Sequence, residues 1–176
     1  MLTSWEKISE EPYQPFWRKL IKKTYRLPDG TLHTFDILDD GDAVCVFALT
    51  SENKVVLTKQ YRPGPDKIIY ELPGGAVDHG EDALEAIKRE FLEETGYTGE
   101  FDLLGTMIRD AYSTRTQYNF IAKNCHKVQE QELDEHEFID VEEVSLERFK
   151  EILKIGEMSD VACGYIALLK IQGGEI

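Results

Sequence analysis

The spacing of apolar and polar residues divides the chain into short strand-like runs and three helix-like segments. Residues 17–25 and 31–38 flank Pro28-Asp29-Gly30, a turn tripeptide, and predict an N-terminal hairpin. Further strands are expected at 43–49, 55–61, 68–72, 101–108, 118–122 and 138–144. Helices are expected at about 82–95, at 145–153 with Ser145 as the N-cap, and at roughly 160–171.

The order of these elements indicates the fold class. Asp39-Asp40-Gly41-Asp42 interrupts the pattern, and we place a boundary there between a small N-terminal β subdomain, residues 1–41, and a main domain, residues 42–176. Strands surround one central helix, and two helices close the chain. The main domain is therefore expected to belong to the α+β class, with its elements in layers.

The composition restricts where the protein works. With 176 residues, of which 41% are hydrophobic and 31% charged, the chain can build a single core. No apolar run approaches the roughly 18 residues that span a bilayer, and the first residues lack the layout of a secretory signal. Cys45, Cys125 and Cys163 show no paired spacing, which argues against disulfides and zinc. We expect a cytoplasmic protein without a membrane partner.

The formal net charge of −14 restricts the partners further. A nucleic acid needs a basic surface that releases counterions, so no nucleic-acid partner is expected. An anionic small molecule would need local cations, either Arg and Lys side chains or metal ions, to overcome the overall field.

The central helix carries carboxylates on its apolar side. On a helical wheel, Glu90 and Glu94 overlap the core-facing arc and Glu93 borders it. The core-facing arc comprises Ala83, Leu84, Ala86, Ile87 and Phe91, and the opposite side comprises Glu85, Lys88, Leu92 and Thr95. Acids on a helix usually form a solvated face, but carboxylates against a core repel one another and resist desolvation. A bound divalent cation removes this penalty, and clustered oxygen ligands favour Mg²⁺ or Mn²⁺.

The residues next to these carboxylates leave several roles open. Pro73-Gly74-Gly75 is expected to end a strand, and a peptide carbonyl there could supply another oxygen ligand. Glu81 has either a favourable contact with the helix dipole or a functional role. Arg89 could orient one of the carboxylates, or could form an ordinary contact with Glu85 or Glu93.

The segment 75–97 resembles the Nudix box, Gly-x5-Glu-x7-Arg-Glu-U-x-Glu-Glu-x-Gly-U, in which U is a bulky apolar residue. The matching residues are Gly75, Glu81, Arg89, Glu90, Phe91, Glu93, Glu94, Gly96 and Tyr97. Every fixed position matches, and Phe91 and Tyr97 are aromatic where aliphatic residues are commoner. The resemblance implies a Nudix α/β/α sandwich with a mixed central sheet, which hydrolyses a diphosphate linkage.

The resemblance also implies roles for single residues. Glu90 and Glu94 would bind Mg²⁺, for which Mn²⁺ can substitute, and Gly74 would offer its carbonyl oxygen. Glu93 would be a metal ligand or would activate water. The supporting residues of this cluster would be Arg89 and Glu81.

Other features are similar to the branch of ADP-ribose pyrophosphatases and nucleotide-sugar hydrolases. In that branch Arg62, within Gln60-Tyr61-Arg62-Pro63, would contact the substrate diphosphate, and Glu71 would contact the nucleotide end. A surface strand position is the alternative for Arg62. The N-terminal segment in this branch typically exchanges across a homodimer, and its aromatic residues help to bind the base. The candidates here are Tyr13, Phe16 and Trp17, for which a core or interface role is the alternative.

The sequence after the box adds two acids and two arginines. Residues 134–139 resemble the loop that supplies a late acid in this branch, so Glu137 would be a further metal ligand and Glu135 a general base. A solvated loop is the competing interpretation, because the region is rich in acids. The branch's usual Ser-Pro-Gly is replaced by residues 110–115, which leaves ADP-ribose itself open as the substrate. Arg109 and Arg115 could contact phosphate or sugar, or be solvated.

The sequence therefore predicts a pyrophosphohydrolase for a nucleoside diphosphate derivative. ADP-ribose or a nucleotide sugar is the leading expectation, and the products would be a nucleoside monophosphate and a phosphorylated moiety. A dinucleoside polyphosphate or a nucleoside triphosphate is the alternative substrate. A ligand-sensing module without catalysis is disfavoured. Such modules commonly have an eroded box and an attached DNA-binding segment, and we expect neither in this chain.

Overall fold

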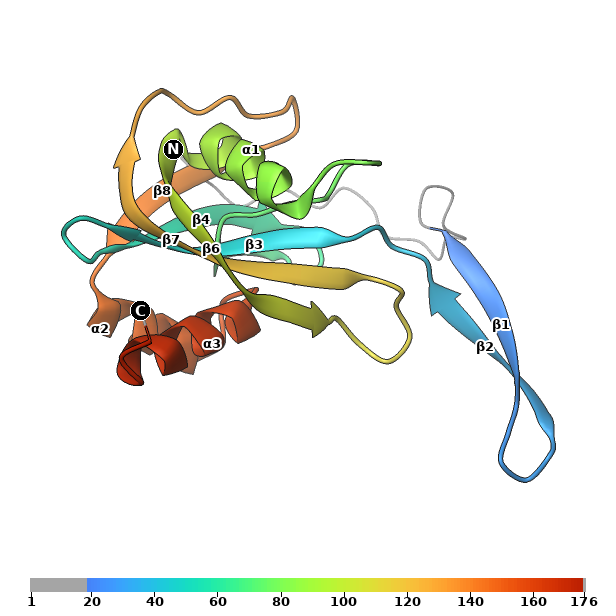
Figure 1. Cartoon of the computed structure of the whole chain (residues 1–176). Coiled ribbons are helices and arrows are strands. Elements are labelled where there is room, and N and C mark those ends of the chain that lie inside the picture. Colours follow the sequence, from blue (N-terminus) through green and yellow to red (C-terminus); the bar gives the residue numbers. More distant parts are fainter. Residues whose placement is uncertain (1–18, 176) are drawn as a thin grey trace.

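The computed structural model describes residues 19–175, and Figure 1 shows how their strands and helices are arranged. Tyr13, Phe16 and Trp17, expected to contribute to substrate binding or an interface, lie outside the described residues. The strands are β1 (Leu20–Arg26), β2 (Leu32–Leu38), β3 (Ala43–Thr50), β4 (Val55–Arg62), β5 (Lys67–Glu71), β6 (Tyr97–Ile108), β7 (Thr116–Lys127) and β8 (Ile139–Val144). The helices are α1 (Ala83–Thr95), α2 (Leu146–Ile155) and α3 (Val161–Gln172).

The main sheet is mixed, as the sequence predicted. Its strand order is β5-β4-β3-β7-β6, and β8 pairs with β4. Strands β3 and β7 are parallel, and the other pairs are antiparallel. Two neighbouring parallel strands need a long connection. The connection between β3 and β7 contains β4, β5, α1 and β6.

Helices cover both faces of this sheet, with α1 on one face and α2 and α3 on the other (Figure 1). Strand β3 lies in the middle and alternates between two hydrophobic clusters. Val44 and Val46 belong to the cluster that includes residues of α1. Cys45 and Phe47 belong to the cluster that includes residues of α2 and α3. The α/β/α sandwich is therefore confirmed, and burial on both faces explains why β3 reads as a continuous apolar run.

The hairpin of β1 and β2 forms a separate two-stranded sheet that projects from the main domain (Figure 1). Its base is held by main-chain hydrogen bonds: the Leu38 N–H donates to the Tyr112 carbonyl at 2.8 Å, and the Thr114 N–H donates to the Leu38 carbonyl at 2.9 Å. Large apolar side chains such as Leu32, which is 64% exposed, remain open to solvent on it. The hairpin is therefore attached to the main domain mainly through its last residues.

Strands β6 and β7 are longer than the sequence predicted. The expected ranges 101–108 and 118–122 lie inside Tyr97–Ile108 and Thr116–Lys127. Their pairing shifts register between Thr98 and Glu100 and between Leu103 and Gly105. These irregularities break the alternation of apolar and polar residues, so the pattern alone underestimates both strands.

The structure bears on membrane spans and on the three cysteines. Within residues 19–175, no helix is long and apolar enough to cross a membrane. Cys45, Cys125 and Cys163 are all buried free thiols, so none of them forms a disulfide.

Candidate active site

Helix α1 is capped at both ends. At its start the Asp82 side chain accepts a hydrogen bond from the Leu84 N–H at 2.9 Å. At its end Gly96 has a left-handed φ of 75°, and its N–H donates to the Leu92 carbonyl. A Cβ atom on Gly96 would also meet the Gln129 carbonyl oxygen at 2.2 Å. The residue that ends the helix is therefore also a place where the segment after β7 packs closely.

The three carboxylates of α1 differ in burial. Glu94 is only 6% exposed, whereas the side chains of Glu90 and Glu93 are 17% and 40% exposed. This order agrees with the helical wheel, which placed Glu90 and Glu94 in the core-facing arc. Thr95 differs from the expectation: it is 1% exposed, because its hydroxyl turns back to donate to the Phe91 carbonyl.

The loop after β5 lies against these carboxylates. The Gly74 N–H donates to Glu94 Oε2 at 3.0 Å, and the carbonyls on either side of Gly74 accept hydrogen bonds from Val46 and Val44 of β3. A Cβ atom on Gly74 would meet the Val44 carbonyl oxygen at 2.2 Å, and one on Gly75 would meet Glu90 Cδ at 2.3 Å. Close approach of backbone to backbone and of backbone to carboxylate explains the two glycines.

Arg89 connects the acids of the box. Its Nη1 donates to Glu90 at 3.0 Å and to Glu93 at 3.1 Å. Its Nε and Nη2 both donate to Glu81 at 3.0 Å. The contact with Glu93, one of the two alternatives for Arg89, is thus one part of a network of three acids. Arg89 and Glu81 hold the partly exposed carboxylates in place beside Glu94.

The electrostatics of the cluster depend on burial. Burial raises the pKa of Glu94 to about 8, although the hydrogen bond from the Gly74 N–H opposes this shift. Burial also raises the pKa of Glu90, against the lowering effect of Arg89. Hydrogen bonds from Arg89 lower the pKa of Glu81. A nearby cation would favour the charged forms of Glu90 and Glu94, which their surroundings disfavour.

The donor atoms of this cluster are carboxylate and carbonyl oxygens, which hard divalent cations prefer. Their positions, however, do not form a complete coordination site. Among the described residues, no three His, Cys, Asp or Glu side chains form a group that could hold a metal ion as they stand. Arg89 lies between Glu90 and Glu93 and provides the positive charge there. The fit therefore rests on the buried carboxylates and the adjacent glycine loop.

The segment between β7 and β8 packs against the end of α1. The Gln131 side-chain amide donates to the Glu94 carbonyl at 2.6 Å and to the Ile139 carbonyl at 3.1 Å. Glu137 is half-buried on this segment, and its charge contributes to the raised pKa of both Glu90 and Glu94. Glu135 lies on an exposed turn of the same segment. Glu137 is therefore near the box carboxylates, whereas Glu135 faces solvent.

A cleft of about 670 Å³ contains the other expected residues. It is lined by Asp40, Arg62, Pro63, Gly64, Pro65, Ile69, Glu71, Arg109, Arg115, Gln117, Ser159 and Asp160. Arg62, Glu71 and Arg115 were expected from the sequence as substrate residues, and the fold brings them together from β4, β5 and the segment before β7. The cleft lies close to the box acids, because Glu71 lines it and the N–H of Gly74, three residues later, donates to Glu94.

Arg62 is held by Glu71 at the wall of this cleft. Its Nε and Nη2 donate to the Glu71 carboxylate at 2.7–3.0 Å, and the Gln60 amide donates to Glu71 Oε2 at 2.6 Å. Glu71 is 5% exposed. Within the described residues, Arg62 Nη1 makes no hydrogen bond, so a fixed guanidinium presents a donor to the cleft.

The other two arginines flank the segment that replaces Ser-Pro-Gly: Arg109 directly precedes it and Arg115 ends it. Arg115 Nε donates to the Gly41 carbonyl at 2.9 Å, and Arg109 Nη1 lies 2.7 Å from the Asp40 carboxylate. Their side chains are 28% and 40% exposed. Both arginines line the cleft and are oriented by the link between β2 and β3.

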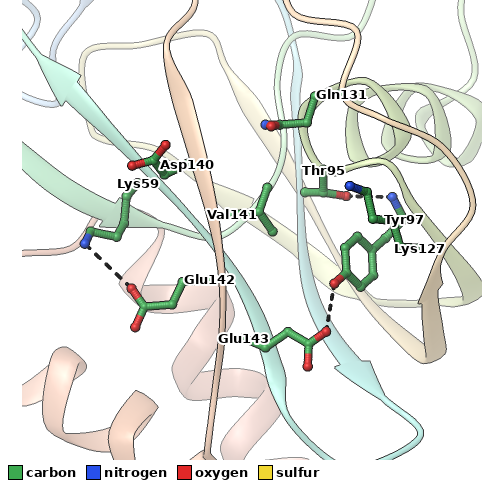
Figure 2. Close-up of a pocket in the computed structure, with 9 residues that line it drawn as sticks. All are labelled: Lys59, Thr95, Tyr97, Lys127, Gln131, Asp140, Val141, Glu142 and Glu143. Atoms are coloured by element: carbon green, nitrogen blue, oxygen red, sulfur yellow. Dashed lines mark hydrogen bonds and ion pairs between the residues drawn. The ribbon is translucent and has the colours of Figure 1, made fainter. Parts of the chain in front are cut away.

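A second pocket, of about 480 Å³, lies between the end of α1 and β8 (Figure 2). Lys59 is 3.6 Å from Glu142, and the Tyr97 hydroxyl donates to Glu143 at 2.7 Å. Lys59 and Tyr97 therefore already have partners across this pocket. Among the described residues, none expected to bind metal or substrate lines it.

Four residues of the cleft network were not expected in the site from the sequence: Gln60, Gln117, Ser159 and Asp160. Gln60 lies two residues before Arg62, on the same face of a strand, and this spacing was an available signal. Asp160 was expected only at a helix start. Residues 117 and 159–160 are brought to Arg62 by the packing of α3 and the sheet, which no local spacing reports.

Comparisons with known proteins agree on the family and on the fold of this chain. The NUDIX domain matches residues 39–160. The ADP-ribose pyrophosphatase of Bacillus subtilis (strain 168) is 32% identical over 142 residues, which are 79% of this chain and 77% of that protein. The methanol dehydrogenase activator of Bacillus methanolicus is 32% identical over 157 residues, which are 85% of each chain.

A solved structure agrees with the fold over nearly the whole chain. The crystal structure of an ADP compounds hydrolase superposes with a TM-score of 0.78 at 16% identity, and the match covers 99% of this chain and 97% of that one. The projecting hairpin and the helices on both faces of the sheet are therefore parts of one known architecture.

Proposed function

This chain belongs to the Nudix family and is a pyrophosphohydrolase of nucleoside diphosphate derivatives, and from that premise we propose that its substrate is ADP-ribose or a nucleotide sugar. The products are a nucleoside monophosphate and a phosphorylated sugar moiety. The observation that carries the proposal is a cleft of about 670 Å³ that joins Arg62, Arg109 and Arg115. A diphosphate has two charged phosphates, which arginine side chains bind well.

The cofactor that we propose is Mg²⁺, with Mn²⁺ as a substitute. Glu90, Glu94 and Glu137 would hold it, together with the carbonyl oxygen of Gly74. The support is the oxygen-only donor set and the raised pKa of Glu90 and Glu94. When bound, such an ion neutralises the diphosphate and activates water. It also supplies positive charge that a chain of net charge −14 otherwise lacks.

The chain's own residues bind the substrate and transfer the proton. Arg62, fixed by Glu71, binds the diphosphate, and Arg115 binds phosphate or sugar at the other side of the cleft. Glu93 takes the proton from the attacking water, because it is 40% exposed and lies beside Glu90 on the same arginine. Glu135 is the alternative base, and its exposed turn would have to move toward the cluster.

We also propose that the protein is a cytoplasmic homodimer. The hairpin of β1 and β2 projects from the main domain and exposes large apolar side chains, including Leu20 at 56% and Leu32 at 64%. A second copy would bury this apolar surface. Trp17 would then contribute to base binding from the preceding segment. Sedimentation measurements of the intact chain and of a Leu32→Glu variant test the dimer.

A substrate panel in which chromatography separates the phosphorylated products tests the function. ADP-ribose, nucleotide sugars, dinucleoside polyphosphates and nucleoside triphosphates are each incubated with the protein and Mg²⁺. We expect the fastest turnover with ADP-ribose or a nucleotide sugar, and a loss of at least about 100-fold in the Glu94→Gln variant. Glu85→Gln, which changes an exposed carboxylate on the same helix, should retain activity. Faster turnover of a triphosphate or dinucleoside polyphosphate would contradict the substrate assignment.

A further inference from the structure

The cleft contains a carboxylate, Asp160, that the Nudix box does not account for. Its Oδ2 accepts a hydrogen bond from the Ser159 hydroxyl at 2.6 Å, and its Oδ1 accepts one from the Gln117 amide at 3.2 Å. A carboxylate has about four acceptor positions. Asp160 therefore keeps acceptor capacity in a cleft that it lines together with Arg62.

Glu71, the other carboxylate beside Arg62, differs from Asp160 in this respect. Its oxygen atoms accept hydrogen bonds from Gln60 and Arg62, and Ser159 lies at 3.0 Å from Oε1. The four contacts with Gln60 and Arg62 fill the roughly four acceptor positions of the Glu71 carboxylate, whereas Asp160 accepts two hydrogen bonds. Of these two carboxylates, Asp160 has more room for a hydrogen bond to a bound molecule.

The start of α3 does not explain why an acid lies at this position. Asp160 occupies the N-cap, where an aspartate usually accepts a hydrogen bond from the helix backbone. Its side chain makes no such bond, and its backbone is left-handed with φ of 55°. The carboxylate reaches Gln117 of β7 instead. The helix therefore gains no capping hydrogen bond from the acid, whereas the cleft gains an acceptor.

We propose that Asp160 determines specificity by accepting a hydrogen bond from a hydroxyl or amine group of the nucleoside diphosphate derivative in this cleft. The inference rests on the proposed function. The three arginines that line the cleft match the phosphates, and an acceptor beside them matches the neutral donors that flank a diphosphate. Sugar hydroxyls and the amine of adenine are the two sources of such donors.

Two substitutions of Asp160 test this role without disturbing the backbone. Asparagine and glycine both tolerate a left-handed φ. For Asp160→Asn and Asp160→Gly we expect kcat/KM for ADP-ribose to fall at least about tenfold, mainly through a higher KM. The melting temperature should change by less than about 4 °C. A lower melting temperature with an unchanged KM would assign Asp160 a purely structural role and overturn the proposal.

Asp66→Asn is the matched control. Asp66 has the same φ of 55° but does not line the cleft. Its side chain accepts a hydrogen bond from the Tyr61 hydroxyl at 3.5 Å, which asparagine can also accept, so this variant should keep the wild-type KM. A KM increase as large as that of Asp160→Asn would show that the effect is not specific to the cleft, and the proposal would fail.

Substrate analogues identify the donor and separate this inference from the proposed function. If a ribose hydroxyl is the donor, Asp160→Asn should have no effect on a deoxyribose analogue of ADP-ribose; if the amine is the donor, it should have no effect on the inosine analogue. Equal loss with all three substrates overturns the proposal.

Binding of α,β-methylene ADP-ribose, which cannot be cleaved, separates the two claims. Wild-type binding without turnover of ADP-ribose contradicts the function, while a weaker affinity of Asp160→Asn still supports the contact.

Discussion

The side-chain amide of Gln131 donates to the main-chain carbonyl of Glu94 at 2.6 Å. One residue later on the same segment, the Glu132 N–H donates at 2.9 Å to the carbonyl of Glu93, which is one residue earlier on the helix. Carbonyls at the end of a helix have no partner inside the helix. The segment after β7 satisfies them, and the same segment carries Glu137. Two acids proposed to bind one ion are thereby tied together through the backbone.

The Gln131→Met variant tests whether the hydrogen bonds of Gln131 position Glu137 for catalysis in addition to stabilising the fold. Methionine fills a similar volume but donates no hydrogen bond, so the Glu94 and Ile139 carbonyls lose a partner. We expect a loss of about 1–2 kcal/mol in the free energy of unfolding. We also expect kcat to fall with little change in KM, because the loop carrying Glu137 is no longer fixed. Urea titration and steady-state kinetics measure the two effects.

Gln129→Met is the control for Gln131. Within residues 19–175, the Gln129 amide donates only to the exposed Glu132 side chain, at 3.2 Å. Its loss should leave both stability and kcat near the wild-type values. The positioning role also predicts that Gln131→Met adds little to the defect of Glu137→Gln, because both changes remove the same contribution. Fully additive losses would contradict it.

We expect Glu94 to make the metal-free protein less stable as the pH rises. Its pKa is about 8 in the folded protein, above the ordinary value of 4.5, because burial disfavours the charge. The folded state therefore holds this proton more tightly than the unfolded state. Stability from this group is greatest below about pH 4.5 and is lost as the pH rises to about 8. The loss is at most about 5 kcal/mol. Urea titrations with a chelator at several pH values measure it.

Glu94→Gln should flatten this dependence, because glutamine does not titrate. The variant should be more stable than the wild type at pH 8 when a chelator is present, although it is inactive. Mg²⁺ should stabilise the wild type more than the variant. An equal slope in both proteins would show that Glu94 does not carry the effect.

Much of the fold follows from the sequence because its elements are locally marked. Alternating residues around Pro28-Asp29-Gly30 predicted the hairpin, and Gly96 ends α1 where expected. Ser145 caps α2 by accepting a hydrogen bond from the Arg148 N–H. The length of β7 was missed because bulges disturb its pairing with β6. Thr95 was placed on the wrong side because its hydroxyl can bond within the helix and become buried.

The candidate site also has parts that local spacing predicts and parts that depend on tertiary packing. The burial of Glu90 and Glu94 could be predicted, because the spacing along one helix determines which residues face the core. The place of Asp160 in the cleft could not, because Asp160 lines the cleft with Arg62 only after α3 packs on the sheet. The engagement of Glu71 by Arg62 also depends on a strand register, which pairs Arg62 with Lys67 and Thr58 with Glu71. Local patterns identify the metal cluster, and tertiary packing builds the cleft.

Gly75→Ala should remove activity while the fold is retained. The new Cβ atom would meet the Glu90 carboxylate at about 2.3 Å. The end of a flexible side chain can move, so we expect a loss of no more than about 1–3 kcal/mol in stability. The displaced Glu90 should weaken metal affinity, which titration with Mn²⁺ measures by electron paramagnetic resonance.

Gly74→Ala should behave differently, although the two glycines are neighbours. Its Cβ atom would meet the main chain of β3 at the Val44 carbonyl and at Cys45 Cα. Backbone in the centre of a sheet cannot move aside as a side chain can. We therefore expect Gly74→Ala to unfold at clearly lower urea concentration than Gly75→Ala. Equal stability of the two variants would show that the backbone of this loop shifts easily.

Arg62→Lys should weaken substrate binding because lysine cannot reproduce a fixed guanidinium. Arg62 meets the Glu71 carboxylate through two nitrogen atoms and keeps Nη1 for the cleft. A lysine ammonium would pair with Glu71 and leave no donor in the same position. We expect KM for ADP-ribose to rise about tenfold, with a smaller change in kcat. Lys67→Arg is the control: Lys67 lies on the neighbouring strand β5 and forms an exposed ion pair with Glu157, so its replacement should leave KM unchanged. If Arg62→Lys lowers kcat and KM is unaffected, then Arg62 acts on the transition state rather than on binding, and the role assigned to it here is wrong.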